Sequence, residues 1–241
     1  MADAMDSKSI SREGVGVQVP ASAPPRAASS AEELAASVRG RLEDDPYLRA
    51  ALPALVHRVN NATQILTGLN ALLSLPGGAE LFATRASDLA AVSEVYDRSG
   101  WLLAVFGSAL GAATLSDRRE RDGLVPVVEL ARELARRRGR ELEFSGALPS
   151  LEPRAGLGFE LPWAVGAWMH GALLATPDGA RVRFVGTDRR GAWSLTDDAP
   201  IDAARADLAR RIEARVPGSA HAANEARIDF DARWFARSDA R

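Results

Sequence analysis

The chain contains no cysteine among its 241 residues. This absence excludes a disulfide framework, a thiolate metal site and a cysteine nucleophile. Histidine is scarce too, and the three histidines, His57, His170 and His221, are too widely spaced in the sequence to predict a metal site. We therefore expect no metal centre, and the lack of cysteine suits a cytoplasmic protein.

Long hydrophobic runs are also missing. A membrane-spanning helix needs ~20 consecutive apolar residues, whereas the longest run covers residues 101–115 and contains Gly107 and Gly111, which predicts a buried helix. The N-terminus shows no basic start followed by an apolar core and a cleavage site. Residues 1–30 are instead rich in Ala, Ser, Pro and Gly, which predicts a disordered tail or an over-extended start of the reading frame. We expect no membrane partner.

Lysine is nearly absent, since Lys8 is the only one among 30 basic residues. The 32 acidic residues are interleaved with the arginines and leave a net charge of −2, so we attribute the arginine content to a GC-rich genome and expect no nucleic-acid partner. With 46% hydrophobic residues, the sequence predicts one sizeable globular domain or two small ones.

One stretch, residues 57–66, carries candidate chemistry. On a helical repeat His57, Asn61 and Gln64 share a face. A neutral imidazole can attack a phosphoryl group through its unprotonated nitrogen, and an amide one turn later can bind a phosphoryl oxygen without adding negative charge. This pattern predicts His57 as phosphoacceptor and Asn61 as a positioning residue, with an ordinary surface or core histidine as the alternative. A separate apolar stripe, which predicts partner helices, consists of Leu52, Leu55, Val56, Val59, Leu66, Leu69, Leu72 and Leu73.

The order His57, Arg58, Asn61 and Gln64 resembles the dimerisation and histidine-phosphotransfer helix of two-component sensor histidine kinases, in the subfamily whose box reads His-Arg-x-x-Asn. The resemblance implies that His57 accepts a phosphoryl group. It leaves two interpretations of Arg58: the guanidinium steadies the phosphoryl charge or contacts an acidic receiver face, or it is a solvated surface arginine.

The flanking sequence predicts a helical hairpin. One helix should span about residues 30–42, and a second should begin at Asp45 and Pro46 and end before the turn signal Pro76-Gly77-Gly78. Pro53 should mark either the start of that second helix or a kink in it. A further long helix over residues 79–116 can fold back antiparallel.

Two such helices leave apolar surface uncovered. The resemblance implies that residues 31–117 form a homodimeric four-helix bundle, and the alternative is an intramolecular bundle completed by residues 30–42. The charged stretch at residues 116–123 predicts a linker.

A second module is expected over residues 118–241. Its pattern predicts, in order, a helix with Val127 and Leu134 on its stripe, a strand at 141–144, a helix at 161–176, a hairpin of 181–185 with 192–196, a helix at 202–216 and a closing strand at 226–235. This order is that of an α/β sandwich, so the expected fold class is α + α/β. We expect the tryptophans at 163, 168, 193 and 234 to fill its core.

Residues 163–182 resemble the ATPase domain of histidine kinases, which implies a degenerate copy here. Ala167 and Gly171 occupy the positions of the family's metal-holding asparagines. Only Asp197 remains of the adenine-binding region, where Ala199 and Ile201 replace glycines. We therefore expect ATP binding to be lost, no tightly bound cofactor, and magnesium supplied by the receiver partner.

Together these features predict a histidine phosphotransfer protein of a phosphorelay, which exchanges a phosphoryl group between His57 and response-regulator receiver domains. This organisation is similar to that of histidine phosphotransferases with a degenerate ATPase-like domain. Two alternatives stay open: an inactive dimerisation scaffold that binds a receiver or kinase, and a divergent histidine autokinase.

Overall fold

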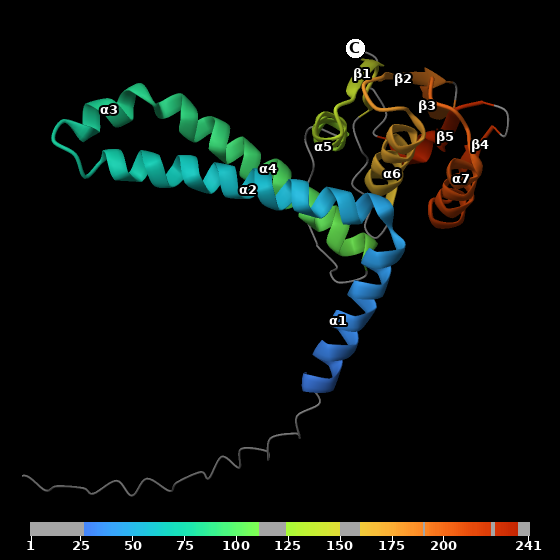
Figure 1. Cartoon of the computed structure of the whole chain (residues 1–241), viewed down its shortest axis with the longest axis horizontal. Coiled ribbons are helices and arrows are strands. Elements are labelled where there is room, and N and C mark those ends of the chain that lie inside the picture. Colours follow the sequence, from blue (N-terminus) through green and yellow to red (C-terminus); the bar gives the residue numbers. More distant parts are fainter. Residues whose placement is uncertain (1–26, 111–123, 150–159, 190, 223–224, 236–241) are drawn as a thin grey trace, which may run out of the picture.

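The computed structural model describes residues 27–110, 124–149, 160–189, 191–222 and 225–235. These residues form helices and one mixed five-stranded sheet, with a long helical arm that projects from the sheet-containing module (Figure 1). The predicted linker at 116–123 lies outside the described residues. Residues 1–26 of the predicted tail lie outside them too. The helices are α1 (Ala27–Asp44), α2 (Pro46–Leu72), α3 (Gly78–Thr84), α4 (Ala86–Ala109), α5 (Val125–Arg137), α6 (Glu160–Ala175) and α7 (Ala203–Arg215). The strands are β1 (Glu141–Gly146), β2 (Arg181–Arg189), β3 (Ala192–Asp197), β4 (Ser219–His221) and β5 (Arg227–Asp231), and a 3₁₀ turn, η1, follows at Ala232–Trp234.

Helix α2 carries the His57 box and begins where the sequence predicts. The Asp45 carboxylate accepts hydrogen bonds from the backbone N–H groups of Tyr47 and Leu48, both at 3.0 Å, and so satisfies donors that have no partner within the helix. Pro46 occupies the first turn, where its missing N–H costs nothing. The helix continues through Pro53 to Leu72, so the alternative in which it begins at Pro53 is wrong.

The arm consists of α2, α3 and α4. Gly77 adopts a left-handed φ of 72°, and a Cβ at Gly78 would lie 1.8 Å from the carbonyl oxygen of Leu72, so the tight turn requires both glycines. The predicted single helix over 79–116 is wrong, because it divides at Arg85. There the Thr84 hydroxyl bonds to the Leu81 carbonyl, and Arg85 pairs with Asp88 in the next turn.

Helix α1 extends away from the arm and not along it (Figure 1). Its start at Ala27 makes the last four residues of the predicted tail helical. Val38 and Leu42 pack against the core near the base of α2. The alternative of an intramolecular bundle completed by residues 30–42 is therefore wrong.

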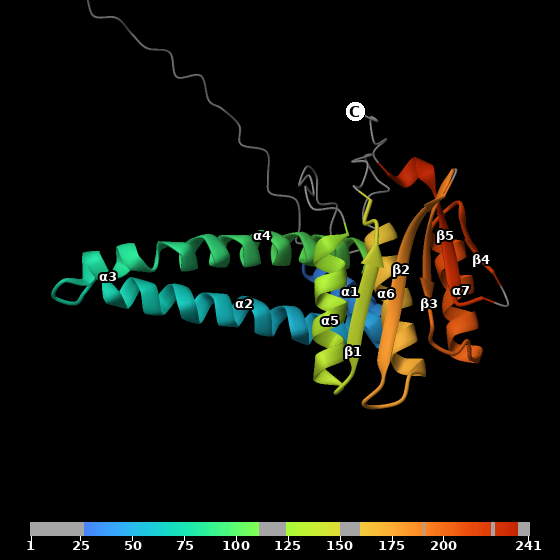
Figure 2. The ribbon, with the colours of Figure 1, turned by 90° about the horizontal axis from the view of Figure 1, so that it is seen from above.

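The sheet has the order β1-β2-β3-β5-β4, in which only β1 and β2 pair in parallel. Helices α6 and α7 lie on one side of it, and α5 packs beside β1 (Figure 2). Alternate residues of β2 are buried, among them Val182 and Phe184, whereas Val185 on the other face is exposed. The predicted hairpin, helices and closing strand are present. Strand β4 is an addition, because three residues are too few to give a sequence pattern.

The core joins the base of the arm to the sheet module. Tyr47, Leu48 and Leu55 of α2 pack in the same buried cluster as Trp163 and Trp168 of α6. All four tryptophans expected in the core are buried, which confirms that prediction. The first part of α2 is therefore held against the second module, and its orientation there fixes where His57 lies.

The outer part of the arm is far less covered. Leu55 and Leu69 of the predicted apolar stripe are buried, but Val56, Leu66 and Leu73 are 54%, 40% and 51% exposed. None of the helices in the described part of the chain is both long enough and apolar enough to cross a membrane.

Candidate functional site: the His57 cavity

Two anchors position the His57 helix. Besides capping α2, the Asp45 carboxylate accepts a hydrogen bond of 2.8 Å from the indole Nε1 of Trp163 on α6. Further along α2, the Thr63 and Tyr96 hydroxyls lie 2.6 Å apart and join α2 to α4. His57 lies between these anchors, on a helix fixed at both ends of the site.

His57 is exposed, and Asn61 lies next to it. Asn61 Nδ2 is 3.2 Å from His57 Nε2. An amide NH₂ group can donate to this nitrogen when Nε2 is unprotonated, which is the tautomer with the proton on Nδ1. Asn60, the adjacent amide in the sequence, does not line the cavity described below. The structure therefore brings together the two residues that the sequence selects, with Asn61 next to Nε2 of the imidazole.

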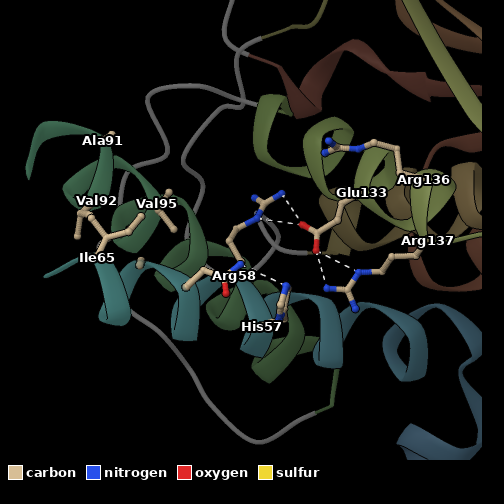
Figure 3. Close-up of a pocket in the computed structure, with 11 residues that line it drawn as sticks. His57, Arg58, Ile65, Ala91, Val92, Val95, Glu133, Arg136 and Arg137 are labelled. Carbon is tan, nitrogen blue, oxygen red and sulfur yellow. Dashed lines mark hydrogen bonds and ion pairs between the residues drawn. The ribbon is translucent and has the colours of Figure 1, made fainter. Parts of the chain in front are cut away.

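Arg58 is not the solvated arginine of the second interpretation, because its side chain is only 17% exposed. Its Nε and Nη2 donate to one oxygen of Glu133 on α5, at 3.3 and 3.1 Å. The other oxygen of Glu133 accepts from Arg137 Nη2 at 2.7 Å and Nε at 3.2 Å (Figure 3). Glu129, one turn earlier on α5, pairs with Arg98 of α4. These ion pairs fasten α5 across both helices of the arm.

A cavity of about 510 Å³, open to solvent, lies between α2, α4 and α5. Figure 3 shows that His57 and Arg58 enter it from α2, whereas Glu133, Arg136 and Arg137 come from α5. The lining consists of His57, Arg58, Asn61, Ala62, Ile65, Ala91, Val92, Val95, Glu133, Arg136 and Arg137. Gln64, the fourth residue of the sequence box, is exposed and lies outside it.

The α5 side of the site is absent from the sequence prediction. From the sequence alone, the arginines at 136–138 are interpreted as complementing the negative end of their helix. The available signal is the spacing of Glu129, Glu133 and Arg137, which repeats every four residues and places all three on one face of α5. The contacts of this face with α2 and α4 depend on tertiary packing, which no pattern in the sequence predicts.

The region of the predicted adenine site is filled by the chain's own side chains. The Arg205 guanidinium donates to both oxygens of Asp197, at 2.9 and 2.6 Å, and stacks 4.4 Å from the ring centroid of Trp168. The two side chains are 1% and 0% exposed. Burial raises the pKa of the Asp197 carboxyl above its usual range, against the opposing effect of Arg205. The Asp197 carboxylate is therefore already paired with an internal cation.

Next to this pair, α6 and α7 leave a cavity of only about 120 Å³, lined in part by Ala167, His170 and Gly171. Ligand sites usually have at least about 300 Å³. A Cβ at Gly171 would lie 2.7 Å from Leu208 Cδ2, so α7 packs closely on α6 at one of the predicted asparagine positions. His170 is buried here, and burial lowers its pKa to about 4, which keeps the imidazole neutral at physiological pH.

No cluster of three or more potential metal ligands occurs within the described ranges.

No protein-family model matches the sequence, and no curated protein matches it either. Among solved structures, the histidine kinase AdeS of Acinetobacter baumannii is similar over 69% of this chain and 94% of its own, with 14% identity and a TM-score of 0.34. A histidine kinase from Burkholderia phymatum is similar over 73% and 95%, with 14% identity and a TM-score of 0.31. Both TM-scores are too low to establish a shared fold or activity, so function has to follow from the site itself.

Proposed function

We propose that this chain is a histidine phosphotransfer protein of a two-component phosphorelay. His57 accepts a phosphoryl group from the aspartyl phosphate of one receiver domain and returns it to the aspartate of another. The observation that supports this most directly is the exposed His57, whose Nε2 faces Asn61 at the edge of an open cavity of about 510 Å³. A partner protein can reach this histidine without unfolding any described element.

The chemistry requires no proton transfer. The Nε2 lone pair attacks phosphorus, the bond from phosphorus to the aspartyl oxygen breaks, and the receiver's carboxylate leaves with the bonding electrons. Nδ1 keeps its proton throughout. In this proposal Asn61 Nδ2, which lies 3.2 Å from Nε2, donates to the lone pair in the resting site, turns aside during attack and then donates to a phosphoryl oxygen.

The donor in this proposal is a receiver and not ATP. The Asp197–Arg205 pair and the close packing of α7 on α6 favour loss of nucleotide binding, because a nucleotide would have to displace a buried ion pair. The receiver's acidic pocket then supplies the magnesium ion that the transfer needs. Receiver domains of such relays operate in the cytoplasm, which is where we place this chain.

The proposal is tested by mixing the protein with each phosphorylated receiver domain of the source organism, with an ATP-only sample alongside. We expect radiolabel that is stable to alkali and labile to acid, as phosphohistidine is, from at least one receiver and none from ATP. Label from ATP would instead indicate an autokinase. Receiver binding without any label would indicate a scaffold, and either outcome would overturn the proposal.

The proposal includes a homodimer formed by the arm. Val59, Leu66 and Leu73 are spaced seven residues apart and so form a stripe along α2, of which Leu66 and Leu73 are 40% and 51% exposed. Leu75 and Leu81 add exposed apolar surface near the end of the arm. Pairing two arms into a four-helix bundle would remove this surface from water, which stabilises the dimer.

We expect Leu66→Glu to convert the dimer to a monomer, because each copy would place a carboxylate opposite its partner in an apolar contact. Sedimentation velocity measures the change directly. Ala71→Glu is the matched control, since this exposed residue lies on another side of the same helix and should leave the dimer intact. A monomeric wild type at micromolar concentration would refute the homodimer.

A further inference from the structure

The second module contributes charge to the cavity at His57. Three arginines line this cavity, Arg58 from α2 with Arg136 and Arg137 from α5, and Glu133 is the single carboxylate among its described lining residues. The lining therefore has a formal charge of about +2 at neutral pH. A phosphoryl group that passes through this space would meet a positive surface built by two modules.

Arg137 is the α5 arginine whose head group is fixed. Glu133 accepts from its Nε and Nη2, while none of the described residues accepts from its Nη1. The side chain remains 39% exposed, whereas that of Glu133 is 16% exposed. Figure 3 shows this guanidinium held by the Glu133 carboxylate, and Arg137 is one of the residues that line the cavity.

The second arginine bound by Glu133 has a different function. Arg58 uses its Nε and Nη2 on the other oxygen of Glu133 and lies within 3.9 Å of Glu129, and its side chain is 17% exposed. Arg58 therefore pairs with two carboxylates and holds α5 to α2. Arg137 pairs with one carboxylate only and is more exposed, so its guanidinium is the better placed of the two to bind an anionic ligand.

We propose that Arg137 is a catalytic residue of the phosphotransfer site, which binds oxygens of the phosphoryl group as it moves between the receiver's aspartate and His57. This inference rests on the phosphotransfer function proposed above. In the loose transition state of phosphoryl transfer, negative charge spreads over three equatorial oxygens. An oriented guanidinium stabilises that charge, because its planar donors match paired oxygens and its dipoles need no reorganisation during the reaction.

A consequence is that the degenerate second module takes part in catalysis. Helix α5 would have to stay docked on the arm for transfer to occur, and the ion pairs Arg58–Glu133 and Arg98–Glu129 provide that docking. Retention of the module after loss of its nucleotide site then has a chemical reason.

The test is the rate of label transfer from the identified phosphorylated receiver, measured in single turnovers over a range of receiver concentrations. For Arg137→Gln we expect the limiting rate to fall by about 10-fold or more, which is less than the ~100-fold typical of a buried oxyanion donor because Arg137 is partly exposed. The receiver concentration at half-maximal rate should change little. Arg137→Lys should restore part of the limiting rate, since it returns the charge without the planar geometry.

Arg132→Gln is the matched control, because Arg132 is exposed on the same helix and does not line the cavity; it should transfer at the wild-type rate. The inference is wrong if Arg137→Gln has a wild-type limiting rate, if only its half-maximal concentration changes, or if Arg137→Lys restores nothing. These outcomes leave the proposed function standing whenever the wild type is labelled. Failure of the wild type to accept label would overturn the proposed function and this inference with it.

Discussion

The His57→Gln variant is expected to take no label from any phosphorylated receiver domain. Glutamine has similar length and can still hydrogen-bond to Asn61, but its amide nitrogen has no available lone pair and cannot attack phosphorus. Because His57 is exposed and lies outside the core, the free energy of unfolding should change by less than about 0.5 kcal/mol. Loss of label with unchanged stability and unchanged receiver binding would assign the phosphoacceptor to this side chain.

Two companion variants make the assignment specific. Asn61→Ala should slow transfer without abolishing it, since it removes a hydrogen-bond donor and leaves the nucleophile. Asn60→Ala, which changes the neighbouring amide outside the cavity, should behave as the wild type. If His57→Gln still accepts acid-labile phosphate, another nucleophile carries the function. His170 would be a poor substitute, because it is 2% exposed.

Local chemistry explains which parts of the fold could be predicted from the sequence. Asp45 and Pro46 begin α2, and Pro76 with Gly77 ends the first half of the arm, because capping and left-handed backbone geometry depend on adjacent residues alone. The break at Arg85 has no such local signal, since it depends on hydrogen bonds and ion pairs among residues that otherwise favour a helix.

The candidate site was half predictable for the same reason. His57 and Asn61 are four residues apart on one helix, so their contact follows from the helical repeat. Glu133 and Arg137 come from a helix about 75 residues later in the chain, as the Arg58–Glu133 separation shows. Their arrival beside His57 depends on the packing of two modules, and no periodic pattern within either one specifies it.

The predicted loss of the nucleotide site is a comparable case. The sequence shows that Ala199 and Ile201 stand where glycines are expected, which concerns the backbone. It does not show that Arg205 extends from α7 to Asp197, eight residues earlier, and fills the space with a buried ion pair. The sequence shows the substituted residues, and the structure adds an internal ion pair at the same place.

That ion pair gives the largest expected effect on stability. Asp197→Asn should lower the free energy of unfolding by about 3–5 kcal/mol, because it leaves the buried Arg205 without its counter-charge. Denaturant unfolding at neutral pH measures the difference. Asp207→Asn is the matched control, since it changes a carboxylate of the Arg210–Asp207 pair on α7, whose side chains are 70% and 57% exposed, and it should cost less than about 1 kcal/mol.

A double variant separates the pair from the space that it fills. Asp197→Leu with Arg205→Met removes both charges and keeps apolar volume, so it should recover most of the stability lost in Asp197→Asn. If Asp197→Asn is instead as stable as the wild type, the guanidinium has another partner or reaches water, and the region near Trp168 is open enough to admit a ligand. The ATP-only sample of the transfer experiment, repeated with Asp197→Asn, would then show whether that opening restores any reaction with nucleotide.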